Sequence, residues 1–504
     1  MNSNGNKIDW MITIIPFSMI ITLAVFLFAF PDQSNEIISK VHFFVGDTFG
    51  VFYLIIGLGM LFVSLFLSFS SYGKIVLGDP GEKPKYSFFV WGSMMFTCGL
   101  AADILFYSFS EWIMYAVNPH LTEMGSVTEW AGVYPLFHWS FIPWAFYLVM
   151  AVIFGFMLHV RKRNRQRYSE ACRPVIGDHA DRLLGRIIDL FAVFALLAGT
   201  ATTFSVATPL LASIIVKLLN IQISREIVTI IILLITCIVY TYAVLHGIKG
   251  ISFLAKLCIW MFFGLLLFVF LFGGQTRFIL ENGFQSFGKM IQNFIDLSTF
   301  ADPSRTSNFP QDWTIFFWAY WMVWCIAAPF FIGNISRGRT IRQTILGGYV
   351  FGVGSTVISF IVLGNYSLGM QVFQRADYIS LYKNGYDLYE LILMIIDTLP
   401  FSKIILILIS FTMIAFYATS FDSIAYTASC YSYKQIKQNE TPHKLIELLW
   451  CILLIVLPIS LVFSESSMNN IQSVSIISAF PIGIVMMIMV RSFFIDANKY
   501  INNK

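Results

Sequence analysis

Twelve apolar stretches, separated by polar and charged segments, follow one another along almost the whole chain. A transmembrane helix needs about 20 consecutive, mainly apolar residues, and each stretch is long enough to form one. We therefore predict an all-α integral membrane protein whose spans lie near 11–30, 50–70, 88–112, 134–160, 187–216, 226–246, 252–275, 312–333, 344–366, 402–428, 446–465 and 470–492.

Two further stretches, 281–298 and 385–399, are apolar but interrupted by charged residues. A helix with one apolar and one charged face lies along a membrane or protein surface instead of crossing the bilayer. We therefore expect both stretches to form amphipathic helices outside the bilayer.

Composition agrees with a membrane protein and excludes several function classes. Of the 504 residues, 12% are charged and 57% hydrophobic, whereas soluble domains carry about 25% charged residues. The connecting segments contain no nucleotide-binding motif and are too short for an ATPase domain. The spans contain no nucleophile–base pair, and the seven cysteines show neither metal spacing nor a paired framework. We expect neither an enzyme nor an ATP-driven pump, and no cofactor or bound metal.

The basic residues indicate an orientation. Lys and Arg are enriched on the cytoplasmic side of membrane proteins, and placing both termini in the cytoplasm puts most of them inside, including the cluster Arg161-Lys162-Arg163. This bias accounts for the basic segment 161–173 without a nucleic-acid partner. We predict a multi-pass protein of the cell (plasma) membrane, surrounded by the lipid bilayer, with both termini cytoplasmic.

Two spans are interrupted at corresponding places. The third contains Cys98-Gly99-Leu100-Ala101-Ala102, mostly small residues, followed by Asp103, and the eighth contains Cys325-Ile326-Ala327-Ala328 followed by Pro329. Non-helical backbone inside a bilayer occurs only where it is buried or lines a cavity. Broken helices five spans apart suggest two five-span repeats with a substrate site between them. The alternative is that these are kinks without a function, because a proline bends a helix by removing one hydrogen bond.

Aromatic residues concentrate at 318–324 in the eighth span. At about 100° per residue, Tyr320, Trp321 and Trp324 fall within an arc of roughly 100° on one helical face. Electron-rich rings on one face can surround a cation that has no N–H group, which is how proteins hold quaternary ammonium groups. The alternative is an interfacial belt, because Trp and Tyr also anchor helices at the membrane surface.

Four motifs, in order along the chain, carry a resemblance to a known family. They are the third span through Phe106-Tyr107 to Glu111, the segment 138–147 of the fourth span, the run 318–324 followed by Ile335-Ser336-Arg337-Gly338-Arg339-Thr340, and the segment 418–423 of the tenth span. With these motifs the chain resembles the betaine/carnitine/choline transporter (BCCT) family over nearly its whole length.

The resemblance implies an architecture. Members have twelve transmembrane helices, with two extra N-terminal helices before a five-plus-five inverted repeat (LeuT-like), and are frequently homotrimers. The implied segments are 1–87 (helices 1–2 and a cytoplasmic loop), 88–275 (first repeat), 276–311 (extracellular connection with an amphipathic helix), 312–495 (second repeat) and 496–504 (short cytoplasmic tail).

The resemblance also implies a substrate-binding cage of six aromatic residues: Trp139, Trp144 and Tyr147 of the fourth span with Tyr320, Trp321 and Trp324 of the eighth. Each ring could contribute about 0.5–2 kcal/mol around a desolvated trimethylammonium group. Three departures from the family pattern stand out. Tyr320 replaces the usual Trp, Asn334 replaces the usual Arg, and Ala101 and Asp103 replace glycines of the Gly-x-Gly-x-Gly segment of betaine-carrying members.

Asp103 is the residue that bears most on substrate and coupling. An acid at mid-membrane is costly and is by default a functional hypothesis. When ionised it would neutralise a cation without a carboxylate of its own, such as choline, and its protonation could be linked to release. An Asp at this position resembles choline carriers thought to be proton-coupled, so we assign Asp103 to both substrate binding and ion coupling. The alternative is that it caps the broken helix.

Two other arrangements compete with proton coupling: a bound sodium ion, and a positively charged side chain in place of that ion. Thr419 and Ser420 lie where sodium-coupled members ligate the ion, with carbonyl groups near Thr97 and Leu100. Hydroxyls on helices also often bond to their own backbone, and the resembling proton-coupled carriers share the Thr-Ser pair. Lys256 lies near the position of an arginine in the family's ion-independent carnitine antiporter, although snorkelling to the interface is the alternative.

The sequence therefore predicts a secondary active transporter of quaternary ammonium compounds that works by alternating access. A choline-like substrate and proton-coupled uptake (H+) are the first prediction, with glycine betaine or carnitine as the next substrates. The alternatives are a sodium-coupled (Na+) glycine betaine symporter and an ion-independent carnitine-type antiporter.

Overall fold

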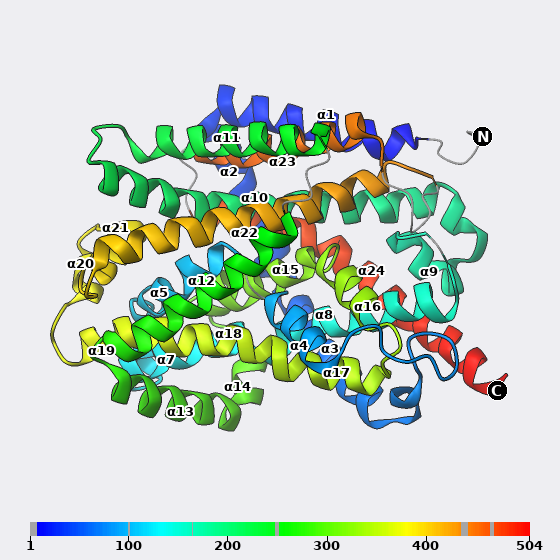
Figure 1. The fold of residues 1–504 in the computed structure, drawn as a ribbon, viewed down its shortest axis with the longest axis horizontal. Helices are drawn as coiled ribbons and strands as arrows, with labels where there is room; N and C mark the ends of the chain where they lie inside the picture. Colours follow the sequence, from blue (N-terminus) through cyan, green and yellow to red (C-terminus); the bar gives the residue numbers. More distant parts are fainter. Residues whose placement is uncertain are drawn as a thin grey trace.

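The computed structural model describes residues 8–98, 101–163, 165–246, 251–434, 442–463 and 468–503, and helices make up most of them (Figure 1). These ranges contain no β-structure beyond two isolated bridges, which join Ile8 to Tyr433 and Val76 to Thr340. The all-α class predicted from the sequence is confirmed.

The helices of the first half are α1 (Trp10–Ala29), α2 (Pro31–His42), α3 (Gly50–Phe69), α4 (Phe88–Thr97), α5 (Asp103–Ala116), α6 (Pro119–Glu123), α7 (Val127–His138), α8 (Phe141–Gly155), α9 (Tyr168–Ile176), α10 (Leu183–Leu219), α11 (Arg225–His246) and α12 (Ile251–Phe272). Those of the second half are α13 (Thr276–Gln292), α14 (Phe294–Thr299), α15 (Ile315–Trp324), α16 (Ala328–Ile335), α17 (Ile341–Gly348), α18 (Gly354–Ser359), α19 (Asn365–Val372), α20 (Tyr378–Lys383), α21 (Leu388–Asp397), α22 (Ser402–Tyr431), α23 (Lys444–Phe463) and α24 (Met468–Asn502). Short π-helical or 3-10 segments join several of them: η1 (Phe43–Thr48), η2 (Ser71–Lys74), η3 (Phe156–Val160), η4 (Gly177–Asp181), η5 (Pro310–Thr314), η6 (Tyr349–Val353) and η7 (Phe360–Gly364).

Helices occupy all of the stretches that the sequence marks as spans. By length and composition, seven described helical segments could cross a membrane, or up to nine if each of two bent pairs counts as one span. Two more apolar helices, Phe88–Thr97 and Ser402–Ala418, have 10 to 17 residues. The chain is therefore a multi-pass membrane protein, and the number of twelve spans stays a prediction.

Both stretches predicted as amphipathic helices are helical, as α13 and α14 and as α21. α13 leaves α12 at an angle of 110°. The turn depends on glycine, because Gly274 has φ +71° and a Cβ atom on Gly273 would lie 2.8 Å from the Tyr366 ring.

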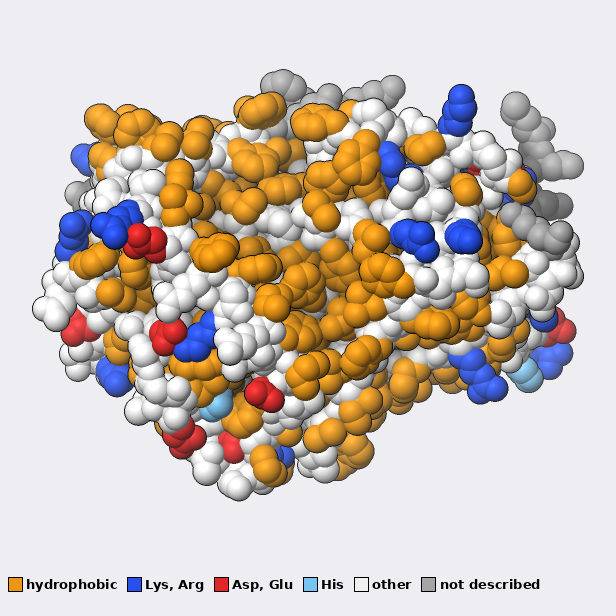
Figure 2. Space-filling model, turned by 90° about the horizontal axis from the view of Figure 1, so that it is seen from below, with side chains coloured by type: hydrophobic (Ala, Val, Ile, Leu, Met, Phe, Trp, Pro, Cys, Tyr) orange, Lys and Arg blue, Asp and Glu red, His pale blue; other side chains and the backbone are white. Residues whose placement is uncertain are grey.

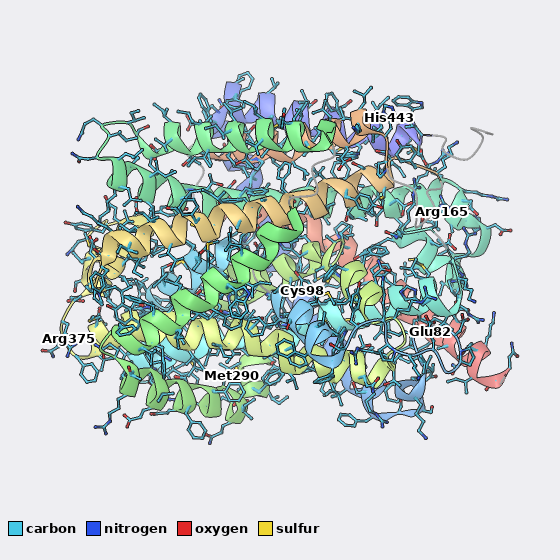
Figure 3. All side chains as sticks on the ribbon, viewed as in Figure 1. Glu82, Cys98, Arg165, Met290, Arg375 and His443 are labelled. Atoms are coloured by element: carbon cyan, nitrogen blue, oxygen red, sulfur yellow. The ribbon has the colours of Figure 1, made fainter. Side chains whose placement is uncertain are left out.

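Both predicted interruptions are present. α4 ends at Thr97 and α5 begins at Asp103, while α15 ends at Trp324 and α16 begins at Ala328 after a bend of 56°. Pro329 lies in the first turn of α16, where its missing N–H removes no helical hydrogen bond. Cys98, at the first break, lies near the middle of the long axis of the bundle (Figure 3). The first break therefore lies about halfway along the bundle.

The surface has the polarity of a membrane protein. Figure 2 shows hydrophobic side chains across the middle of one face and most of the charged side chains towards its two ends. Large apolar side chains such as Ile238, Trp260 and Phe411 are exposed, which a soluble monomer rarely tolerates over so wide an area. A bilayer around the middle of the bundle accounts for this distribution.

The start of α1 and the end of α24 lie at the same end of the bundle, where Figure 3 labels Arg165 (Figures 1 and 3). The Asp9 N–H donates to the carbonyl of Ser432 at 2.7 Å, and Arg161 lies 2.7 Å from Asp496 in α24. The first and last described helices therefore reach the same side of the bundle.

The candidate site is surrounded by long helices. α15 packs against α3, α8, α10 and α24, and α5 packs against α7, α10 and α21. The aromatic run at 318–324 is buried except for Trp324, so it does not form an interfacial belt.

Candidate functional site

Four of the predicted cage residues form one group of touching rings, which we call the ring cluster: Trp139, Trp144, Tyr147 and Trp321. The centroid of the Trp321 ring lies 4.8 Å from that of Tyr147, 5.7 Å from that of Trp139 and 5.9 Å from that of Trp144. The Trp144 and Tyr147 centroids are 5.7 Å apart. Residues from the fourth and eighth spans therefore meet, as the sequence predicts.

Local structure explains how these rings come together. Trp144 and Tyr147 are three residues apart on α8, so they share one face of that helix. Trp139 lies at the corner between α7 and α8, where the Thr356 hydroxyl donates to its carbonyl at 2.6 Å. Gly352 makes room for the Trp144 ring, because a Cβ atom there would lie 2.3 Å from it.

The ring cluster is closed. Its four side chains are between 0 and 6% exposed, and the rings pack directly on one another. A cation held by several rings must lie within about 6 Å of each centroid, over the ring faces. The four rings must therefore separate before a trimethylammonium group can enter between them.

Asp103 and Tyr320 form a hydrogen-bonded pair beside the ring cluster. The Tyr320 hydroxyl donates a hydrogen bond to the Asp103 carboxylate, and Thr203 of α10 bonds to the same hydroxyl. Asp103 is 1% exposed and begins α5, where the positive end of the helix dipole favours an anion. Three helices, α5, α10 and α15, thus converge on one buried carboxylate.

Tyr320 and Trp324 lie apart from the ring cluster. The Tyr320 ring stacks on Phe316 at 5.5 Å. Trp324 is partly exposed, packs against α10 at Gly199, and makes no ring contact with the cluster among the described residues. The six residues predicted as one cage therefore divide into four touching rings, one hydrogen-bond donor to Asp103, and one separate indole.

Three aromatic residues outside the predicted cage extend the ring cluster around Trp139. Ring centroids of Tyr107, Phe317 and Phe360 lie 5.6, 5.7 and 5.1 Å from that of Trp139. Tyr107 follows Asp103 by four residues, so helical periodicity alone would have placed both on one face of α5. The two phenylalanines carry no signal that separates them from the other phenylalanines of the spans.

Three donors near the ring cluster are buried and have no hydrogen-bond partner among the described residues: the Tyr107 hydroxyl and the indole N–H groups of Trp144 and Trp321. Buried polar groups are usually hydrogen-bonded, and an unpaired one needs an explanation. A substrate with acceptor oxygens could satisfy them.

Glu111 is a second buried carboxylate close to the ring cluster. It lies eight residues after Asp103 on α5, is fully buried, and accepts a hydrogen bond from the Trp139 indole N–H at 2.8 Å. In the sequence, Glu111 stands out only as the end of the third-span motif. The rule that an acid within a span is a functional candidate would have found it.

Only part of the predicted sodium site lies among the described residues. The Thr97 hydroxyl donates to the Met94 carbonyl at 2.9 Å, within its own helix, and Ser420 is a partly exposed residue of α22. Leu100 and the side chains of Thr419 and Lys256 lie outside the described residues. The sodium site stays a prediction.

The described residues contain no group of three or more His, Cys, Asp or Glu side chains that could hold a metal ion. All seven cysteines are free thiols. The groups described at this site are aromatic rings, hydroxyl groups and two carboxylates.

The chain is similar to several curated transporters. It is 27% identical to a carnitine transporter of Acinetobacter baumannii over 84% of this chain and 76% of that protein. It is 28% identical to the glycine betaine transporter OpuD of Bacillus subtilis, over 93% and 90% of the two chains. A third relative, the uncharacterized transporter YeaV of Escherichia coli, is 26% identical over 85% and 89%.

A solved structure of a substrate-bound, outward-open Na+-coupled sialic acid symporter covers 90% of this chain and 86% of its own, with a TM-score of 0.39 and 13% identity. The model of the BCCT, betaine/carnitine/choline family transporter, matches residues 11–501. The chain therefore belongs to the betaine/carnitine/choline family, whose members are transporters and not enzymes.

Proposed function

We propose that this protein is a secondary active transporter that moves a choline-like quaternary ammonium cation by alternating access, coupled to protons through Asp103. The observation that carries the proposal is the hydrogen bond between Tyr320 and the buried Asp103, beside four touching aromatic rings. A negative charge next to π faces suits a substrate that is a cation and carries no carboxylate.

The ring cluster supplies attraction that does not depend on hydrogen bonding. Each ring face is worth about 0.5–2 kcal/mol to a desolvated cation. Several rings together support micromolar to millimolar binding once the cost of ordering is subtracted. Trp321 is central to this function, because its ring contacts the three other members of the cluster.

Asp103 supplies the coupling. A buried carboxylate is costly when it is ionised without a cationic partner, and Tyr320 and Thr203 offset only part of that cost. A substrate cation lowers the cost when it enters, and a proton lowers it when the cation leaves. The substrate and the proton thus occupy one carboxylate alternately. This exchange links inward movement of the substrate to outward movement of a proton.

Alternating access then requires the rings to separate towards one side at a time. The interruptions at α4–α5 and α15–α16 give the chain two bending points next to Asp103 and Trp321. Such breaks between two repeats are where related folds bind substrate. We place the side that carries both termini in the cytoplasm and include a homotrimer in the proposal.

Transport of a zwitterion is the second candidate function. The three unpartnered donors near the ring cluster would suit the carboxylate of glycine betaine or carnitine, and two relatives are named for these substrates. This arrangement corresponds to sodium-coupled symport of glycine betaine or ion-independent exchange of carnitine, with Asp103 protonated.

Counterflow in proteoliposomes tests the proposal. Vesicles loaded with unlabelled choline should accumulate labelled choline transiently, which neither a channel nor a sensor would do. Asp103→Gly should shift the preference from choline towards glycine betaine. Unchanged selectivity in this variant would remove Asp103 from the mechanism, and absence of counterflow with choline, betaine and carnitine would contradict carrier function.

A further inference from the structure

Glu111 is a buried carboxylate close to the ring cluster that the proposed mechanism does not use. Each of its carboxylate oxygens accepts one hydrogen bond: Oε2 from the Trp139 indole N–H at 2.8 Å and Oε1 from the Tyr115 hydroxyl at 2.6 Å. The residue is fully buried. Burying a carboxylate costs several kcal/mol even when it is hydrogen-bonded, so a neutral residue would be expected here if the side chain only filled space.

A continuous polar chain extends from Glu111 to the start of the eighth span. The Tyr115 hydroxyl bonds to Nδ1 of His138 at 2.8 Å, and Nε2 of the same ring bonds to the Thr314 hydroxyl at 3.0 Å. Glu111 and Tyr115 belong to α5, His138 ends α7, and Thr314 immediately precedes α15. These hydrogen bonds therefore join α5, the end of α7 and the segment just before α15.

Trp139 needs such a partner, because its backbone is not part of a regular helix. It lies between α7 and α8 with φ −116° and ψ 14°, followed by Ser140 with φ −111° and ψ −120°. A helix therefore does not set the direction of its side chain. Packing and the bond to Glu111 hold the indole so that its ring reaches Trp321, 5.7 Å away.

We infer that Glu111 is a positioning residue for substrate binding, which holds the Trp139 indole in the ring cluster through its N–H group. This inference rests on the proposed function, because it takes Trp139 as one wall of the cation site. Glu111 itself need not touch the substrate. A hydrogen-bond acceptor is required at this position, and the negative charge is not.

The test compares three single variants and one double variant in labelled choline uptake. Glu111→Ala leaves the indole N–H without an acceptor, so the KM should rise at least about fivefold while the maximal rate changes less than about twofold. Glu111→Gln keeps an amide oxygen that can accept from the indole and should restore the KM to within about twofold of wild type. Trp139→Phe keeps a ring but has no N–H, so adding Glu111→Ala to it should raise the KM less than about twofold further.

Tyr134→Phe is the matched control. Tyr134 also forms a buried Tyr–His hydrogen bond, to His120 at 2.7 Å, but this pair does not bond to Trp139 or Glu111. Its KM should stay at the wild-type value. If Glu111→Ala does not fold, Tyr115→Phe removes one support of the carboxylate and should raise the KM about two- to threefold.

The outcomes separate this inference from the function on which it rests. A KM that is unchanged in Trp139→Ala would overturn the cage itself. A raised KM in Trp139→Ala together with a normal KM in Glu111→Ala would overturn only the role of Glu111. Equal defects in Glu111→Gln and Glu111→Ala would also overturn it, because the charge and not the acceptor would then matter.

Discussion

The Tyr320 hydroxyl donates a hydrogen bond to the buried Asp103 carboxylate, which lies 217 positions earlier in the chain. Two departures from the family pattern, one on α5 and one on α15, thus turn out to be partners. Tyr320 has a weaker π face than a tryptophan would have, but it supplies a hydroxyl donor that stabilises the Asp103 carboxylate.

Tyr320→Phe tests this partnership, because it removes the hydroxyl and keeps the ring. We expect the KM for choline to rise about tenfold, since a buried hydrogen bond to a charged group is worth about 1.5–3 kcal/mol. Tyr366→Phe is the control, because it removes a bond of 2.7 Å to Thr398 away from the site. Equal KM values in both variants would mean that Tyr320 is a packing residue.

Trp321 and Trp324 should respond differently to truncation, although helical periodicity places both on one face. Trp321 contacts three rings of the cluster, whereas Trp324 packs against Gly199. Loss of a desolvated cation–π face is worth about 1–2 kcal/mol, so Trp321→Ala should raise the KM about tenfold and Trp324→Ala less than about threefold. Initial-rate uptake measures both, and a larger effect at Trp324 would relocate the cation.

Arg167 should be the main stabilising charge at the end of the bundle that carries the termini. It is buried and lies 3.0 Å from Asp189 and 3.7 Å from Asp9, and it donates to the carbonyls of Tyr431 and Tyr433. Removing one partner of a buried ion pair costs about 3–5 kcal/mol. Arg167→Ala should therefore lower the melting temperature in detergent by about 5 °C or more.

Lys40→Ala is the control for Arg167. Lys40 forms an exposed ion pair with Glu36 at 2.6 Å, and exposed pairs contribute about 0–1 kcal/mol. Its melting temperature should match the wild type. Similar melting temperatures for the two variants would show that the buried network does not stabilise the fold.

Asp302 should make the stability of the fold, through the connection between α14 and η5, depend on pH in the acid range. Burial acts to raise the pKa of this carboxyl group, but the N–H groups of Ser307, Thr306 and Asn308 lower it more, so its pKa lies below the ordinary value. A lowered folded-state pKa stabilises the fold above the unfolded pKa of about 3.9, and this stabilisation is lost as the pH falls below that value.

Asp302→Asn should therefore melt at a lower temperature than the wild type at pH 7 and at pH 5, by the same amount. The difference should shrink as the pH falls below about 4. Thermal unfolding of both proteins across this range checks the prediction. A difference that is constant down to strongly acidic pH would contradict the bonding of Asp302 seen here.

The sequence predicted the parts of the site that depend on local chemistry. Pro329 and the mostly small residues at 98–102 predict both interruptions. A proline cannot continue the helix that precedes it, and small side chains loosen helix packing. The family motifs predicted that α8 and α15 share a site. The membrane cost of a charge singled out Asp103.

The parts that depend on tertiary packing could not be predicted. Helical periodicity shows which residues share a face but not which neighbouring helix each of them contacts. It therefore groups Trp324 with Trp321, although Trp324 packs against α10. The bond from Tyr320 to Asp103 joins residues 217 positions apart, and no local pattern encodes it. The link from Glu111 to Trp139 depends in the same way on how α5 and the α7–α8 corner meet.

Choline uptake under imposed gradients tests the central claim most directly. Proteoliposomes with wild-type protein or Asp103→Asn receive an outward proton gradient (acidic lumen), an inward sodium gradient, or neither, with the membrane potential clamped. We expect the proton gradient alone to drive accumulation by the wild type, and Asp103→Asn to equilibrate choline without accumulating it. Accumulation by the wild type that needs sodium and ignores the proton gradient would contradict the account.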